Sequence, residues 1–206
     1  MLNDSILRAL VPAIAISTFG TSMFGTEYSL YALRTLGFKP GVLGVIFAIG
    51  GIGSLIGALM VERISNRYGA GPTMIAGLTL WGAGELCVPI ARSATMLGAV
   101  LMIAQQLSDG AAMLYYINLT TLRQTIPPDT MLGRVNATVR FLVLTCQLAG
   151  TFASGILAEV IGLRATLAIG ASANLVAAGW LVISPIRNLA DVSGPADARA
   201  TAAPSP

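Results

Sequence analysis

The chain has 206 residues, of which 55% are hydrophobic and only 10% are charged. Soluble domains usually carry about a quarter charged residues, so this composition excludes a water-soluble fold for most of the chain. The formal net charge of +3 comes from scattered arginines and one lysine, not from a basic run, which argues against a nucleic-acid partner.

Six apolar stretches are each close to the ~20 residues that a helix needs to cross a bilayer. Turn-forming residues separate them, including Gly37 with Pro40 and the run Pro127-Pro128-Asp129. The stretches are continuous and lack the alternation of membrane strands. The sequence therefore predicts an all-α polytopic membrane protein with six transmembrane helices at residues 9–31, 42–61, 73–91, 96–119, 135–160 and 165–186.

The second stretch is rich in glycine and ends in a short charged loop. Gly53 and Gly57 are four residues apart, so they lie on one helix face where another helix can approach closely. The loop that follows carries Asn66, Arg67 and Gly69. Its charges are expected at the level of the lipid headgroups, and a plain positively charged loop is the alternative to a functional role.

The fourth stretch contains the most conspicuous ionisable residue. Ionisable side chains at membrane depth are costly and are therefore candidates for function. Asp109 lies near the middle of this stretch and shares one helix face with Gln105 and Tyr116. This face predicts a substrate or proton pathway. The alternative is a carboxylate that holds helices together.

Other polar residues lie in the remaining stretches. Arg140 lies inside the fifth stretch, so it either pairs with Asp109 or attracts an anionic substrate. Glu27 ends a polar run in the first stretch and suits a cavity wall. Glu85 is interpreted as structural, and Gln147 and Asn174 as hydrogen-bonding residues between helices.

The chain is expected to divide into an N-terminal segment (1–8), a six-helix domain (9–186) and a small, polar, Pro-rich tail (187–206) that is predicted to be disordered. Lysines and arginines near the helix ends set the orientation of membrane proteins. Six lie on the side of both termini and four on the other, which predicts cytoplasmic termini; the six are Arg8, Arg63, Arg67, Arg123, Arg134 and Arg187, and the four are Arg34, Lys39, Arg92 and Arg164.

A sequence echo suggests an internal repeat. The segment LRTLGFKPGVLG (33–44) resembles LRQTIPPDTMLG (122–133) at an offset of 89 residues. This offset spans three helices, so the second copy is inverted relative to the first, as in the 3+3 inverted repeats of secondary transporters. Coincidence between glycine-, leucine- and arginine-containing segments is the alternative.

Three segments together resemble a known family: YALRTLGFKPGVLGVIFAIGGIGSLIGAL (31–59), LRQTIPPDTMLGRVNATVRF (122–141) and EVIGLRATL (159–167). They are similar to the C-terminal half of major facilitator superfamily transporters, most nearly to bacterial exporters of the enterobactin-exporter type. The resemblance covers nearly all of residues 6–187. It implies that the fourth stretch corresponds to the tenth helix of a twelve-helix transporter, which lines the cavity.

The resemblance also concerns the loop after the second helix. The family carries a motif of the form G-x-L-A-D-R-x-G-R-R there, and Asn66-Arg67-Tyr68-Gly69 matches its D-R-x-G core. Glu62 stands at the first glycine, Asn66 at the acidic position, and Ala70 and Gly71 at the basic ones. These departures weaken the case for a full gating role of the loop.

The function implied by the resemblance is proton-coupled export of a small molecule across the bacterial inner membrane, without a cofactor. The chain would be a fragment, a half that needs a matching N-terminal half, or a half that pairs with a second copy. A non-transporting membrane subunit or truncated relic is the alternative. The absence of histidine and of a Walker motif argues against common membrane enzymes and ATP drive, so no catalytic or metal site is predicted.

Overall fold

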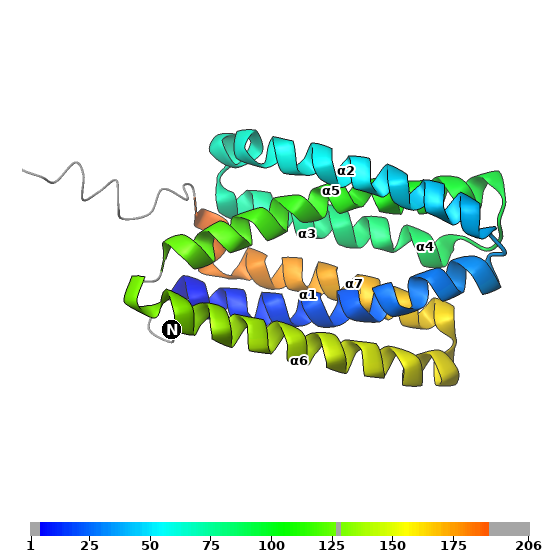
Figure 1. The fold of residues 1–206 in the computed structure, drawn as a ribbon. Coiled ribbons are helices and arrows are strands. Elements are labelled where there is room, and N and C mark those ends of the chain that lie inside the picture. Colours follow the sequence, from blue (N-terminus) through cyan, green and yellow to red (C-terminus); the bar gives the residue numbers. More distant parts are fainter. Residues whose placement is uncertain (1–4, 127–128, 190–206) are drawn as a thin grey trace, which may run out of the picture.

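The computed structural model describes residues 5–126 and 129–189, and these form a bundle of long helices (Figure 1). The described residues contain no strand, which confirms the all-α prediction. Pro127 and Pro128 of the predicted turn lie outside the described residues. The elements are α1 (Ser5–Leu30), the π-helix η1 (Tyr31–Thr35), α2 (Pro40–Tyr68), α3 (Ala70–Glu85), α4 (Cys87–Ile90), α5 (Met96–Thr125), α6 (Asp129–Ile161), α7 (Leu163–Ile183) and the 3₁₀-helix η2 (Pro185–Asn188).

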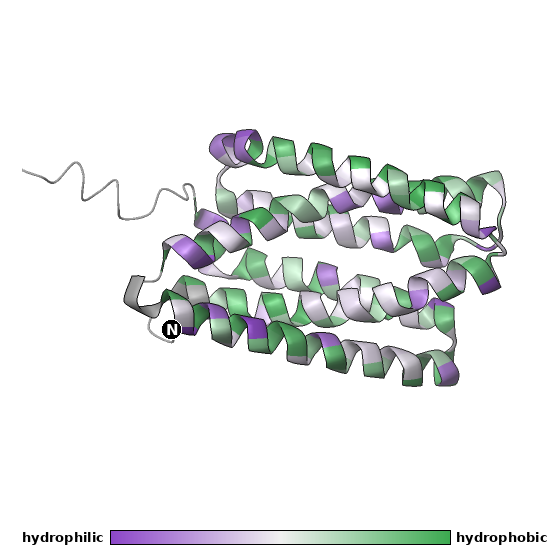
Figure 2. Cartoon of the chain, viewed as in Figure 1, coloured by the Kyte–Doolittle hydropathy of each residue, from purple (hydrophilic) through white to green (hydrophobic). Residues whose placement is uncertain are grey.

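The prediction of six membrane helices is confirmed. Among the described residues, six helical stretches are long and apolar enough to cross a bilayer: Arg8–Thr35, Pro40–Tyr68, Ala70–Ile90, Met96–Thr125, Leu132–Ile161 and Leu163–Ile183. Figure 2 shows the polar C-terminal end of α2 beyond its mostly hydrophobic middle. Several helices are longer than their predicted spans. Hydropathy identifies only the part of a helix that lies in the hydrocarbon core, whereas helical backbone hydrogen bonds continue into the headgroup region.

The third span has a break that the sequence analysis did not predict. The α-helix α3 ends at Glu85 and α4 begins at Cys87. Pro89 follows within α4, and its nitrogen has no hydrogen to donate to the carbonyl of Glu85. The missing backbone bond accounts for the interruption at this point.

The helices pack in a pattern that repeats itself across the bundle. The helix α1 packs against α6 and α7, while α5 packs in the same way against α2 and α3, and α3 meets α7 at the centre. Exchanging α1–α3 for α5–α7 turns each of these contacts into its counterpart. This is the arrangement expected of a 3+3 inverted repeat, and Figure 1 shows α2 and α6 at opposite edges.

Glycine contacts give the register of this repeat. A Cβ added to Gly57 would collide with the backbone of Gly110, and one added to Gly150 would collide with the carbonyl of Phe19. Gly150 follows Gly57 by 93 residues and Gly110 follows Phe19 by 91, whereas the sequence echo predicted 89. The echo lies near the helix ends, where the π-helix η1 and the longer N-terminal part of α6 shift the alignment by up to one helical turn.

Two glycine turns close equivalent hairpins. Gly69 joins α2 to α3 with φ 88° and ψ 155°, and Gly162 joins α6 to α7 with φ 84° and ψ 156°. Residues with a side chain rarely adopt such positive φ values. In each hairpin the hydroxyl of a threonine four residues later, Thr73 or Thr166, donates to the glycine carbonyl.

The predicted tail is ordered over its first residues. Arg187 and Asn188 belong to η2, and the backbone N–H of Gly71 donates to the carbonyl of Leu189 at 3.1 Å. A Cβ at Gly71 would collide with the carbonyl of Ile186, so this contact requires glycine. Residues 190–206 of the predicted tail lie outside the described residues. At the other end, residues 5–8 already belong to α1.

Replacing Gly57 with alanine should destabilise the bundle by about 1–3 kcal/mol, because the methyl group meets fixed backbone of α5. Gly51 lies on the same helix with open space around its Cβ position, so Gly51→Ala is the matched control and should be neutral or slightly stabilising. Thermal unfolding of both purified variants measures this difference. Equal melting temperatures would contradict the close contact between α2 and α5.

Candidate functional site

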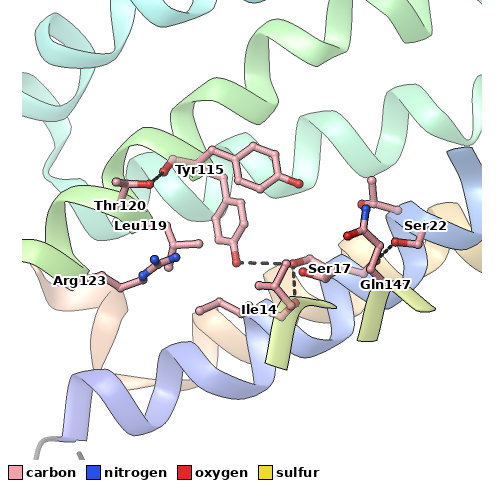
Figure 3. Close-up of a pocket in the computed structure, with 12 residues that line it drawn as sticks. Ile14, Ser17, Ser22, Tyr115, Leu119, Thr120, Arg123 and Gln147 are labelled. Atoms are coloured by element: carbon pink, nitrogen blue, oxygen red, sulfur yellow. Dashed lines mark hydrogen bonds between the residues drawn. The ribbon is translucent and has the colours of Figure 1, made fainter. Parts of the chain in front are cut away.

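A polar cavity of about 290 Å³ lies between α1, α5 and α6. Figure 3 shows its lining side chains converging from these three helices. Eight lining residues are neutral and polar, three are aliphatic and one is charged. They are Ile14, Ser17, Thr18, Thr21 and Ser22 of α1, Tyr115, Tyr116, Leu119, Thr120 and Arg123 of α5, and Val143 and Gln147 of α6.

Hydroxyl groups form much of the cavity wall. The Ser17 and Tyr115 oxygens lie 3.5 Å apart across the α1–α5 boundary, close enough for a hydrogen bond (Figure 3). Ser22 donates to the carbonyl of Thr18 at 2.8 Å, one turn earlier in its own helix. The Ser22 oxygen therefore keeps lone pairs that can accept a hydrogen bond from a bound molecule.

Tyr116 connects the cavity with the interior of the bundle. Its ring lies edge-on to Trp81 of α3, with the ring centroids 5.5 Å apart, and it is also close to the ring of Tyr115. Of the face predicted from the sequence, Tyr116 is the member that lines the cavity. Gln105 and Asp109 lie further along α5 and are not among the lining residues.

Asp109 sits behind the cavity wall in a hydrogen-bonded cluster. Its Oδ1 accepts from the indole N–H of Trp81 at 3.1 Å and from the amide of Gln105 at 3.3 Å. Gln105 is buried, and its side-chain oxygen Oε1 has no hydrogen-bond partner in the described part of the chain. The predicted grouping of Asp109 with Gln105 is thus a direct contact, while Tyr116 stands between Trp81 and the cavity.

A second carboxyl group lies near this cluster. Glu85 is buried and accepts from the side-chain amide of Asn174 at 2.8 Å, which joins α3 to α7. The same amide lies 3.4 Å from the hydroxyl of Thr21, which lines the cavity. The carboxyls of Glu85 and Asp109 are close enough for their charges to interact. Glu85 therefore links α3 to α7, and Asn174 connects it to Thr21 in the cavity wall.

Arg140 does not pair with Asp109 in the structure. Asp109 faces Trp81 and Gln105, while Arg140 is exposed on α6, a helix that hardly touches α5. Arg140 precedes Gln147 by seven residues, which is two helical turns, so both point from the same face of α6. The other interpretation of Arg140, attraction of an anion, stays open.

Glu27 does not form part of the cavity wall, contrary to its predicted place. It is 5% exposed, and its carboxylate accepts from the hydroxyl of Ser154 at 2.7 Å where α6 packs over α1. The inverted repeat has a similar contact across α2 and α5, where the Asn118 amide donates to the Ser65 hydroxyl at 2.9 Å. The earlier part of the predicted polar run, Thr21 and Ser22, does line the cavity.

The loop residues have different surroundings. Asn66 and Arg67 are exposed, and the Arg67 guanidinium lies 5.4 Å from the centre of the neighbouring Tyr68 ring. Gly69 is buried in the hairpin turn, and Gly162 forms the same turn after apolar residues, Val160 and Ile161. Gly69 is therefore explained by backbone geometry. Gly53 and Gly57 lie against α5 around Gly110.

Sequence reasoning missed Arg123 and Gln147 as cavity residues. Arg123 follows Tyr116 by seven residues and so lies on the same face, but it was assigned to the loop because the predicted span ended at residue 119. Extending the polar face by two turns would have found it. No such signal existed for Gln147, since its place depends on how α6 packs against α1.

A sequence model of the Major Facilitator Superfamily matches residues 10–204 of the chain. A search of curated proteins with this chain found no match.

Cysteine labelling tests whether the cavity contains water. With Cys87 and Cys146 replaced by alanine, a Gln147→Cys variant should react with a charged thiol reagent, because Gln147 is exposed at the cavity. Ser172→Cys is the control: Ser172 is exposed on the outer surface of α7 beside Ile169 and Val176, where a bilayer would keep the reagent out. Equal labelling at both positions, measured in membranes, would contradict a water-filled cavity.

Proposed function

We propose that this chain, which belongs to the Major Facilitator Superfamily, supplies one half of a secondary transporter whose substrate path runs along the α1–α5–α6 cavity. Six membrane-length helices and the family make the chain an integral membrane protein that serves membrane transport. The observation that carries the finer proposal is a polar cavity at one side of the bundle, lined in part by the half-buried Arg123.

Arg140 supports the half-transporter interpretation. It lies about 12 Å along α6 from Leu132 at ~1.5 Å per residue, well within the apolar span. A charged side chain at such depth is strongly disfavoured in lipid and usually faces protein or a water-filled space. The exposed face with Arg140 and Gln147 is therefore suited to a second set of helices, either a matching N-terminal half or a second copy of this chain.

The polar cluster behind the cavity supports coupling to protons. Asp109 is held by two neutral donors, and no ion pair to it occurs within the described ranges. A carboxyl without a fixed positive partner can gain and lose a proton as the cavity opens to one side and then the other. Export is the favoured direction because of the resemblance of residues 122–141 to bacterial exporters.

The arginine distribution favours cytoplasmic termini in a bacterial inner membrane. In that orientation the Arg123 end of the cavity faces the cytoplasm and the α4–α5 loop faces outward. Extending the cysteine labelling to intact cells checks this orientation: a cysteine at Ser93 should react from outside, and one at Arg187 only after the cells are opened. The opposite result would reverse the topology.

The half-unit proposal predicts that the chain alone does not transport. Purified chain, shown to be monomeric, is reconstituted into proteoliposomes and compared with the same chain combined with a matching half or allowed to dimerise. Flux is expected only in the combined or dimeric sample, since a single half leaves the α6 face uncovered. Robust flux by the monomer would refute the half-unit, and no flux in any combination would favour the non-transporting subunit or relic.

Asp109→Asn should abolish pH-driven flux in the assembled transporter while leaving folding intact. Asparagine keeps the size of the side chain and an oxygen that can accept from Trp81, but it removes the titratable proton. Glu85→Gln is the matched control, because glutamine keeps an acceptor for Asn174, and it should retain flux.

Proton-gradient flux and melting temperature are measured for both variants. Wild-type flux in Asp109→Asn would remove Asp109 from the coupling mechanism. Lost stability in Asp109→Asn would instead make Asp109 a helix-packing residue.

A further inference from the structure

We infer that the α1–α5–α6 cavity recognises an organic anion, and that Arg123 binds its carboxylate or phosphate group. This inference rests on the proposed function, because it takes the cavity to be the substrate site. It goes further by giving the chemical class of the substrate and the residue that selects it.

The charge of the cavity wall is one-sided. Arg123 is the only charged residue among the twelve that line the cavity. Two buried or half-buried acids of the surrounding helices point elsewhere: Asp109 of α5 is bound to Trp81 and Gln105, and Glu27 of α1 is bound to Ser154 of α6. A cation that has no counter-ion among the described residues favours an anionic ligand.

Arg123 has unused hydrogen-bonding capacity. One of its terminal nitrogens donates to the side-chain oxygen of Asn136 at 3.3 Å, which is a neutral and weak partner. Its Nε is buried and has no hydrogen-bond partner among the residues that the structure describes. Guanidinium has five N–H donors in a planar fork, so Nε and a neighbouring terminal nitrogen can meet both oxygens of a carboxylate or phosphate.

A second arginine adds positive charge on the same side. Arg140 follows Asn136 by four residues, so it projects from the same face of α6 one turn further along. Among the described residues, the side chain of Arg140 has no hydrogen bond or ion pair. Because unpaired positive charges lie on two helices that border the cavity, their fields add and attract anions toward its Arg123 end.

The rest of the wall suits a small organic molecule. Leu119 and Val143 offer apolar contact, while the hydroxyls of Ser17, Ser22 and Tyr115 offer hydrogen bonds to neutral polar groups. The volume of about 290 Å³ lies at the lower end of ligand sites, which usually measure ~300–1,000 Å³. The charged group would then lie at Arg123 and the body of the molecule between α1 and α5.

The test measures binding by the full chain in lipid nanodiscs with probes that share a phenyl ring. Benzoate and phenyl phosphate carry the anionic group, benzamide is the neutral analogue and benzylamine is the cation. Calorimetric titration should show the two anions binding about tenfold or more tightly than benzamide or benzylamine, the effect of one charge-assisted contact. Equal affinity for benzamide, tighter binding of benzylamine or no binding of either anion would overturn the inference.

Variants locate the effect. Arg123→Gln should lose the preference for anions, and Arg123→Lys should keep part of it because the charge remains. Arg134→Gln, an exposed arginine of α6 away from the lining residues, is the control and should bind as the wild type does. If Arg123→Gln does not fold, Arg123→Lys and the wild-type probe series decide. Unchanged anion preference in a folded Arg123→Gln protein would overturn the role of Arg123.

The two proposals fail in different ways. If flux occurs but anions bind no more tightly than neutral analogues, the transport proposal stands and the anion-site proposal is refuted. If anions bind but no assembled form shows flux, the anion-site proposal stands and the transport proposal is refuted.

Discussion

Close contact between glycine and the backbone of a neighbouring helix is the constraint on which the arrangement of this bundle depends. Lipid gives no hydrophobic drive for helices to associate, so packing must come from short-range contact. Gly57 lets α2 lie directly on Gly110 of α5, and Gly150 lets α6 lie directly on Phe19 of α1. These two contacts hold α2 and α6 at opposite edges, and α6 in turn closes one side of the cavity.

Polar groups fall into two classes once the helices are in contact. Glu27 with Ser154 and Glu85 with Asn174 satisfy each other between helices, where an unpaired polar group would be costly. At the cavity, the Ser17 and Tyr115 hydroxyls can bond each other, while the buried Nε of Arg123 has no partner among the described residues. Buried atoms of Tyr28, Gln105 and Asn174 also lack a partner there, so an unpaired atom does not by itself mark a binding surface. Arg123 is distinguished because it also lines the cavity.

The sequence predicts the elements of this fold well and the site only in part. Hydropathy finds all six spans, because the bilayer sets their length and leaves a long apolar run. The same criterion ended the predicted fourth span at residue 119 and so left Arg123 outside it. The helix itself continues six residues further, to Thr125. Glu27 was misplaced for another reason: its exposure depends on α6, and no local pattern shows which helix will cover it.

The inverted repeat shows the same limit more sharply. Helix faces can be recognised in the sequence, yet the echo at an offset of 89 residues aligns the ends of helices and not the contacts between them. The contacts at Gly57 and Gly150 are 93 residues apart, about one turn further, which preserves the face but shifts its depth. Arg140 is exposed on α6, whereas Asp109 of α5 is bound to Trp81 and Gln105, so the helix face separates these two residues. Since lipid would disfavour Arg140, a neighbour of this face must bring polar groups or water. Under the half-transporter proposal, the chemistry of the path would be shared between this bundle and the helices that cover it.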